Sequence, residues 1–266
     1  MLLASLNSGT ETADTKHVDF ALAAVVFAPG LALGSFLNVV AARVPLRRSI
    51  VRPPSACMSC GEQINWYDNL PLISYVLLRG RCRHCQARIP LLYPGVELVT
   101  ALLVAGCVLA FGLTAEAAIA AFFCAVLVAV SAIDIEHRII PNRIVLPATV
   151  VVLVADTARD LSPEWAIAAL AGSGFLLAAA LVYPAGMGMG DVKLALLMGA
   201  ALGRTVSAAL MVGMLAAMVP SLVLFARHGS KARKMGIAFG PFLAIGSVVA
   251  LFWGYDLIDA YLSTVR

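Results

Sequence analysis

The stretch Gly188-Met189-Gly190-Asp191-Val192-Lys193 places a carboxylate and a lysine between two long apolar runs. Charged groups in such a setting are costly to bury and usually serve a function. A second acid has the same setting, since Asp134 follows the uncharged run 117–133 and opens the segment Asp134–Asn142. The sequence therefore predicts helices in a membrane and one catalytic site that contains both aspartates.

The composition assigns the chain to the class of polytopic membrane proteins. Of its 266 residues, 61% are hydrophobic and 13% are charged, whereas an ordinary soluble domain has about 45–50% apolar and about 25% charged residues. The mean hydropathy is +0.93. The net charge of +4 lies mostly in two polar loops, which indicates membrane orientation. Neither loop alternates basic residues with aromatics, so a nucleic-acid partner is not expected.

The apolar runs predict an all-α fold with about eight transmembrane helices, because crossing about 30 Å of hydrocarbon takes roughly 20 residues. The expected spans are 20–42, 91–113, 117–133, 144–155, 165–183, a helix that includes 194–203, then 205–226 and 235–255. The run 144–155 is long enough to cross only if Ile139, Ile140 and a snorkelling Arg143 belong to its end.

The helix through 194–203 decides the topology. Its ten uncharged residues cross a bilayer only if the helix begins before Asp191. If it does cross, the basic loop with Arg227, Lys231, Arg233 and Lys234 lies inside, as the positive-inside rule prefers. Both chain ends then lie outside, and Asp134 and Asp191 lie at cytoplasmic helix ends.

Polarity divides the chain into four regions. Residues 1–19 are expected to form an outer tail, 20–113 a region with the first two spans, 114–255 a region with both aspartates, and 256–266 a C-terminal tail. The only sizeable polar segment, 43–90, carries eight arginines against two acids. Its charge predicts that it faces the cytoplasm.

Two carboxylates that converge where water is scarce cannot both ionise at low cost, so they tend to share one proton. An aspartic peptidase uses this arrangement. The ionised carboxylate takes a proton from water, the water attacks the peptide carbonyl, and the protonated carboxyl stabilises the oxyanion. Glycines at 188 and 190 would let a peptide substrate approach the backbone closely.

Two other interpretations of the aspartates remain open. Asp134 could form a structural ion pair with Arg138, one helical turn further on. Asp191 could pair with Lys193 or Arg143. A proton-coupled transporter also uses intramembrane acids, although that function would not explain the cysteines of the polar loop.

Four cysteines in the polar segment form two CxxC pairs, Cys57 with Cys60 and Cys82 with Cys85, separated by twenty-one residues. This spacing is close to that of four-cysteine structural zinc sites. Four thiolates complete a closed tetrahedral shell without an open position for catalysis. Disulfides are not expected on the reducing cytoplasmic side. The alternatives are a redox dithiol or cysteines without metal, and His84 is expected to be an exposed loop residue.

Five further residues have competing interpretations. Asn38 could belong to a site, but a hydrogen bond between two helices is favoured. Trp66 and Tyr67 could form a recognition surface, but a small core over the metal site is favoured. Cys107 and Cys124 lie in apolar runs and are expected to be packing residues.

Short motifs follow one another in a specific order from Gly34 to about Gly246. They are Gly34–Val40, the two CxxC pairs with Trp66–Asn69 and Leu78–Arg81 between them, Tyr93–Leu98, Asp134–Asn142, Gly188–Leu194 and Phe239–Phe242. Each motif alone is weak, but together they are highly specific. In this order they resemble the motifs of the bacterial type IV prepilin peptidases, which also N-methylate the new amino terminus of their product.

The resemblance implies that Asp134 and Asp191 are the catalytic pair. It further implies that Gly188–Asp191 is the GxGD element shared with presenilin-like intramembrane proteases, and that the four cysteines bind zinc. Residues 20–113 would be the methyltransferase-associated region and 114–255 the peptidase region.

The resemblance also implies the substrates and the location. The substrates would be type IV prepilins or pseudopilins, cut at the cytoplasmic face of the bacterial inner membrane, with S-adenosylmethionine as methyl donor. Glu97 and Asn38 are candidates for contacts with that donor. The alternatives are a peptidase without methyltransferase activity and a proton-coupled transporter with a zinc-stapled loop. The sequence defines neither the particular substrates nor the oligomeric state.

Overall fold

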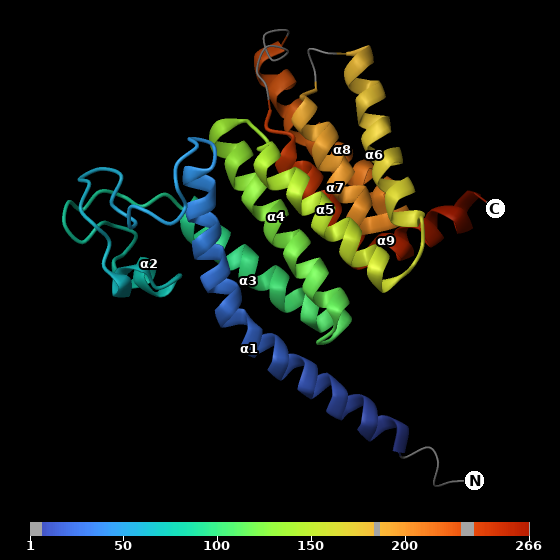
Figure 1. The fold of residues 1–266 in the computed structure, drawn as a ribbon, viewed down its shortest axis with the longest axis horizontal. Helices are drawn as coiled ribbons and strands as arrows, with labels where there is room; N and C mark the ends of the chain where they lie inside the picture. The colour runs from blue at the N-terminus through green and yellow to red at the C-terminus, as the bar shows by residue number, and fades with distance from the viewer. Residues whose placement is uncertain (1–6, 184–186, 230–236, 266) are drawn as a thin grey trace. The chain divides into compact units, whose positions relative to one another are not determined.

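The computed structural model describes residues 7–183, 187–229 and 237–265, and its regular elements there are helices (Figure 1). The all-α expectation is confirmed. The elements are α1 Asn7–Arg43, η1 Trp66–Asn69, α2 Ile73–Leu77, α3 Leu92–Phe111, α4 Ala115–His137, α5 Asn142–Arg159, α6 Glu164–Val182, α7 Met189–Leu202, η2 Gly203–Thr205, α8 Val206–His228 and α9 Gly240–Val265.

Within the described ranges, six helical segments are long and apolar enough to cross a membrane. They are Ala21–Arg43, Leu92–Phe111, Ala115–His137, Glu164–Val182, Met189–Arg227 and Gly240–Thr264. Several spans therefore fit a multi-pass membrane protein, but the expected count of eight is not confirmed. The difference arises because α5 is not among the six, and because α7, η2 and α8 fall within one continuous segment.

Helix ends differ from the expected spans in several places. α5 begins at Asn142, so Ile139 and Ile140 lie outside it. Residues 7–19 and 256–265, which were expected to form tails, continue α1 and α9. α7 begins at Met189, before Asp191, as its length requires. Residues 184–186 of the expected linker 184–190, and 230–236 with most of the basic loop, lie outside the described residues.

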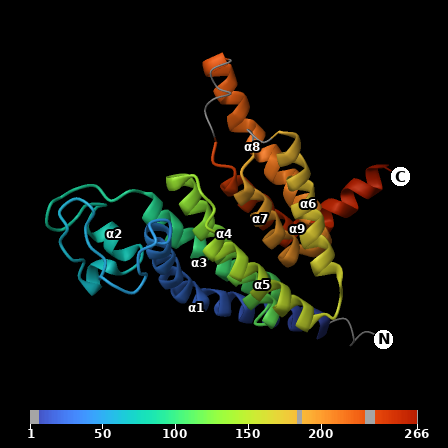
Figure 2. The ribbon, with the colours of Figure 1, turned by 45° about the horizontal axis from the view of Figure 1, so that its top comes forward.

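The first of two compact units comprises residues 1–39 and 51–125. Two glycines of α1 allow α3 to approach closely, and both views show the two helices side by side (Figures 1 and 2). A Cβ at Gly30 would lie 2.8 Å from the Cα of Ala101, and one at Gly34 only 2.5 Å from the Cα of Glu97. This small-xxx-small contact packs α1 closely against α3, the two helices that flank the polar segment in the sequence.

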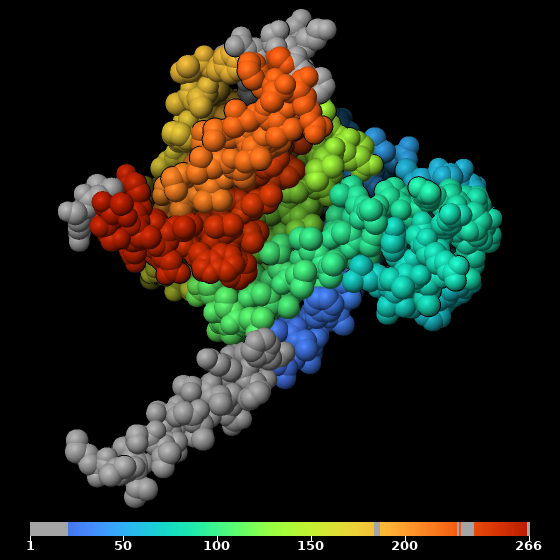
Figure 3. Space-filling view, turned by 180° about the vertical axis from the view of Figure 1, so that it is seen from behind, coloured from blue at the N-terminus to red at the C-terminus, as the bar shows by residue number. Residues whose placement is uncertain are grey.

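The second unit comprises residues 40–50 and 126–266, and α7 is its central element. Contacts with α5, α6, α8 and α9 surround α7, whose side chains from Leu194 to Leu202 are largely buried. Figure 3 shows α8 in orange and α9 in red side by side on one face. A Cβ at Gly199 of α7 would overlap the backbone of α6 at Ala168. Close packing of small residues therefore fixes the course of α7.

The end of α7 away from Asp191 is fixed by an ion pair. The guanidinium of Arg204, in η2, lies 3.0 Å from the carboxylate of Glu164, the first residue of α6. The backbone N–H of Arg204 donates to the same carboxylate at 3.1 Å. The C-terminal end of α7 is thereby tied to the start of α6.

Candidate active site and metal centre

Asp191 lies in the first turn of α7 and is buried. Its Oδ2 accepts a hydrogen bond from the backbone N–H of Gly188 at 3.2 Å, which caps the N-terminus of the helix. The free N–H groups and the dipole of a helix N-terminus stabilise a carboxylate there. A Cβ at Gly190 would lie 2.8 Å from the Cβ of Ile140. Glycine at this position therefore lets the start of α7 pack against the segment that follows Asp134.

Asp134 lies in the last turn of α4 and is also buried. Its Oδ2 accepts a hydrogen bond at 2.9 Å from the backbone N–H of Gly240, the first residue of α9 and 106 residues away in the sequence. A Cβ at Gly240 would lie 2.9 Å from this oxygen. The second carboxylate is thus also held by a glycine N–H at the start of a helix.

The two carboxyl groups lie close enough to repel each other electrostatically when both are charged. The structure therefore brings the two predicted residues together. Within the described residues neither forms an ion pair. Lys193 instead donates to Oδ1 of Asn142 at 3.0 Å, and Arg138 attracts Asp134 only at longer range. Two neighbouring buried carboxyl groups can share one proton, as acid–base cleavage of a peptide requires.

The predicted cysteine cluster forms in the first unit. The sulfur atoms of Cys57, Cys60, Cys82 and Cys85 all lie within 4.8 Å of one another. The distance from the sulfur of Cys57 to that of Cys85 is 3.7 Å, and zinc–sulfur bonds of about 2.3 Å in a tetrahedron require sulfur atoms about 3.8 Å apart. His84 is exposed and lies outside this cluster. The donor set therefore fits a structural zinc ion.

The two CxxC pairs sit on turns with the same hydrogen bonds. The N–H of Cys57 donates to the carbonyl of Glu62 at 2.8 Å, and that of Cys82 donates to the carbonyl of Ala87 at 2.9 Å. Each turn has one residue at positive φ, Gly61 at +73° and Gln86 at +58°. Local backbone geometry thus brings the sulfur atoms of each pair together.

Backbone donors prepare one thiol of the cluster for a cation. N–H groups of Cys60 and Ser59 point at the sulfur of Cys57 and lower the pKa of its thiol to about 6. A thiolate is the form that binds zinc. A backbone hydrogen bond from Glu62 lowers the pKa of the Cys60 thiol, but desolvation and the neighbouring thiols outweigh it and raise this pKa to about 12. Of the first pair, the backbone therefore favours the metal-binding form of Cys57 alone.

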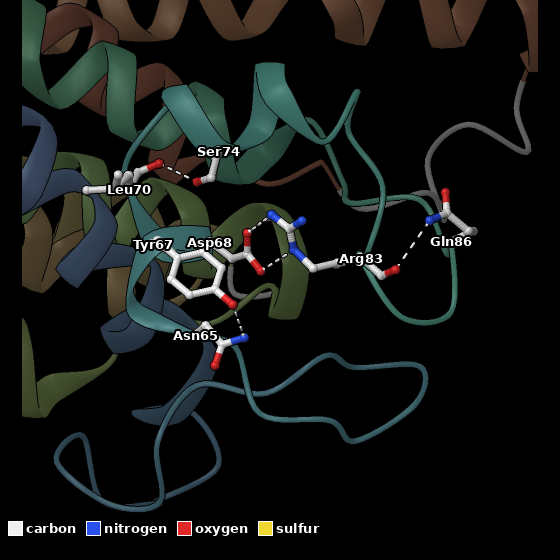
Figure 4. A network of polar contacts seen from close by, with 7 residues as sticks. All are labelled: Asn65, Tyr67, Asp68, Leu70, Ser74, Arg83 and Gln86. Atoms are coloured by element: carbon white, nitrogen blue, oxygen red, sulfur yellow. Dashed lines mark hydrogen bonds and ion pairs between the residues drawn. The ribbon is translucent and has the colours of Figure 1, made fainter.

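An ion pair joins the second CxxC turn to η1 (Figure 4). The guanidinium of Arg83 donates to both carboxylate oxygens of Asp68, at 2.6 and 2.8 Å, and holds the pKa of this carboxyl below its usual value. Arg83 also lies over the ring of Tyr67. The expectation that Trp66 and Tyr67 form a small core is wrong, because Trp66 is 79% exposed and Tyr67 45%.

The candidate donor-binding residues make contacts within the first unit. The side chain of Asn38 donates to the backbone carbonyl of Tyr93 at 3.0 Å, which confirms the expected hydrogen bond between two helices. Oε2 of Glu97 accepts from the N–H of Leu72 at 2.9 Å, and the hydroxyl of Ser35 also bonds this carboxyl. The buried residues Cys107 and Cys124 are packing residues, as expected.

Two contributions were not anticipated from the sequence. The N–H of Gly240 holds Asp134, and the bond from Lys193 to Asn142 ties α7 to the start of α5. A glycine and a proline at 240–241, the first two residues of a long apolar helix, are typical of a helix start. Nothing in the sequence pairs that helix with a residue 106 positions earlier.

Comparison with known proteins agrees with the motifs. The model of the bacterial peptidase A24 N-terminal domain matches residues 29–111, and that of the type IV leader peptidase family matches residues 121–227. Three similar curated proteins are named prepilin leader peptidase/N-methyltransferase. The protein from Bacillus subtilis is 32% identical, over 90% of this chain and 97% of its own length.

The proteins from Xanthomonas campestris and Pseudomonas aeruginosa are each 33% identical over 88% of this chain, and over 92% and 91% of their own lengths. No solved structure matches the chain. Both family models lie in the expected order and the relatives are similar over nearly their whole length, so the chain belongs to the type IV leader peptidase family.

Proposed function

We propose that the protein is a membrane-embedded aspartic endopeptidase that removes the leader from type IV prepilins or pseudopilins. The observation that carries the proposal is the pair of buried carboxylates, Asp134 and Asp191, each bonded to a glycine N–H. The curated relatives bear the name of this activity. A proton-coupled transporter has no such support.

In the proposed mechanism, the two carboxyl groups share one proton. The ionised group accepts a proton from a bound water, whose oxygen attacks the scissile carbonyl. The protonated group donates a hydrogen bond to the oxyanion and then gives its proton to the leaving amine as the carbon–nitrogen bond breaks. The N–H donors of Gly188 and Gly240 keep both carboxyl groups oriented during these transfers.

The proposed membrane topology has eight spans, with α5 and α7 each crossing. Both aspartates and the polar segment then face the cytoplasm, on the side of the bacterial inner membrane where leaders are exposed. The support is the excess of arginine in residues 43–90, which the positive-inside rule assigns to the cytoplasmic side. Residues 20–113 would be the methyltransferase-associated region and 114–255 the peptidase region.

The four cysteines are proposed to hold a structural zinc ion. Their sulfur distances and paired turns suit a closed tetrahedral site. The ion would fold the polar segment, because binding of a structural zinc supplies folding free energy. The folded segment would help to present the substrate at the membrane surface.

The second proposed activity is N-methylation of the new amino terminus. S-adenosylmethionine would supply an electrophilic methyl group. The support is the name of the relatives and the match of the N-terminal domain model to residues 29–111. Asn38 and Glu97 make structural contacts, so no residue is assigned to the donor. A peptidase without this second activity is the alternative.

The intact mass of a prepilin co-expressed with the protein tests both activities. Loss of the leader plus one methyl group is expected with the parent protein and with Asp160→Asn, which changes an exposed acid away from the site. Neither change is expected with Asp134→Asn or Asp191→Asn. Loss of the leader without the methyl would leave only the peptidase. An unchanged mass with a proven family substrate would overturn the proposal.

A further inference from the structure

The short helix α2 exposes its apolar side. Ile73, Val76 and Leu77 are 57%, 72% and 75% exposed, and their spacing of three and four residues places them on one side of the helix. Ser74 is buried, and its hydroxyl donates to the carbonyl of Leu70 (Figure 4). A helix that faces water shows the opposite pattern, with polar residues outside. We call Ile73, Val76 and Leu77 the α2 face.

A hydrogen bond fixes the depth of α2. The N–H of Leu72, directly before α2, donates to the carboxylate of Glu97 at 2.9 Å. Glu97 lies in the second turn of α3, a candidate span that begins at Leu92. Five residues along a helix advance about 7.5 Å. The start of α2 therefore lies level with the first turns of a membrane span, near the headgroups and not far out in water.

The positive charge next to α2 indicates which kind of surface the helix faces. Arg79, Arg81 and Arg88 follow the helix and are exposed, whereas Arg83 is neutralised by Asp68. Basic residues beside a membrane span are attracted to anionic lipid headgroups, by about 1 kcal/mol each. The exposed Trp66 belongs to η1, which contacts α2, and tryptophan is enriched at membrane interfaces.

We infer that the α2 face inserts into the headgroup region of an anionic phospholipid bilayer and holds the cysteine loop against the membrane surface. Three apolar side chains enter the interface, and the arginines meet the lipid phosphates. The inference rests on α3 crossing the membrane and does not depend on either proposed activity. The polar segment is then attached to the membrane by α2 as well as by the two helices that flank it in the sequence.

Single-tryptophan depth probes test the inference in the full-length protein. Trp66, Trp165 and Trp253 are first replaced by phenylalanine, and Val76→Trp or Met58→Trp is then added. Met58 is a matched control, because it is 89% exposed on the same loop but belongs to the first CxxC turn. The proteins are placed in nanodiscs of phosphatidylglycerol and phosphatidylcholine with acyl chains brominated near the headgroup. Zinc content and far-ultraviolet circular dichroism confirm that each variant is folded.

The brominated lipid is expected to quench the probe at 76 about threefold or more strongly than the probe at 58, and acrylamide is expected to do the reverse. Nanodiscs of phosphatidylcholine alone, or the changes Arg79→Gln and Arg81→Gln, should weaken the lipid quenching at 76. Equal acrylamide access at both positions would overturn the inference. So would shielding of the probe at 76 that appears only when a prepilin or a second copy of the protein is added.

Discussion

The aspartate pair and the cysteine cluster are built by opposite means. Asp134 and Asp191 are buried in a helical bundle, and Asp134 takes its hydrogen bond from a residue 106 positions away. The cysteines are partly exposed, and all four lie between residues 57 and 85 on two local turns. Distant helices have to pack before the first site exists. The second needs only local turns and, in our proposal, a metal ion.

This difference predicts how each site fails. A site made by packing is sensitive to a single added carbon at a helix contact. A site made by turns and a metal is sensitive to removal of the metal and tolerates changes elsewhere. The tests below try to break this contrast, beginning with the largest expected effect.

Gly240→Ala is expected to cause the largest loss. The added Cβ would lie 2.9 Å from Oδ2 of Asp134, so the carboxylate or the start of α9 has to move. Displacing a catalytic group by about 1 Å costs about 100-fold in rate. Leader cleavage should therefore fall by about that factor in a prepilin mass assay, while the zinc content stays unchanged.

Gly174→Ala in α6 is the control for this change, because a Cβ there would meet no atom within 4 Å. It should leave cleavage unchanged. If both alanine variants cleave like the parent protein, close packing at Gly240 is not needed to hold Asp134.

Zinc removal is expected to lower cleavage without abolishing it. Loss of the metal should unfold the turns around Cys57 and Cys82, because structural zinc contributes on the order of 10 kcal/mol to the folding of such sites. The aspartates lie in the other unit and should keep their hydrogen bonds. The measurements are zinc stoichiometry, amide hydrogen exchange over residues 55–89 and the cleavage rate before and after chelation.

Cys57→Ser should reproduce the effect of chelation, and added zinc should reverse only the effect of the chelator. Full cleavage activity after verified metal removal would reject the role of the loop in presenting substrate.

Lys193→Met and Asn142→Leu test the tie between α7 and α5. Each removes the 3.0 Å hydrogen bond between the two side chains, which should lower the free energy of unfolding by about 1 kcal/mol. The double variant should lose no more than either single one, because both remove the same contact. Thermal unfolding in detergent measures all three variants. Additive losses would mean that the two side chains act independently.

Exchange of the residues at positive φ should have the smallest effect. Gln86→Gly removes about 1 kcal/mol of strain from the left-handed backbone conformation of this residue. Glycine also raises the conformational entropy of the unfolded chain, which destabilises the folded turn by roughly 0.5 kcal/mol. The net gain of about 0.5 kcal/mol should tighten zinc binding about twofold in a chelator competition. Gly61→Gln at the matching position should weaken binding by a similar factor. If both changes shift zinc affinity in the same direction, the two turns are not equivalent.

The sequence predicted the groups that stand out chemically. Asp134 and Asp191 were found because charge is rare next to apolar runs, and the cysteines because zinc sites have characteristic spacings. The structure brings together the members of each set. Gly240 was not assigned a role, because its contact with Asp134 depends on how helices far apart in sequence pack.

Helices were predicted more reliably than their ends and their relation to the membrane. α5 carries Asp156 and Arg159 in its last turns, and α7 has only 14 residues. Hydropathy alone therefore does not separate a crossing helix from a short buried one. The prediction that Trp66 and Tyr67 form a small core was wrong, because a loop of this size buries too little surface to cover two large rings.

The hydrogen bond between Gly240 and Asp134 also constrains the biosynthesis of the protein. Asp134 leaves the ribosome 106 residues before its donor does, and membrane helices are delivered in the order of synthesis. Until α9 has been inserted, one of the two carboxylates lacks the N–H that orients it. An unfinished chain therefore carries both acids without the geometry of the completed pair. If the pair is catalytic, as we propose, proteolytic activity begins only with the last helix.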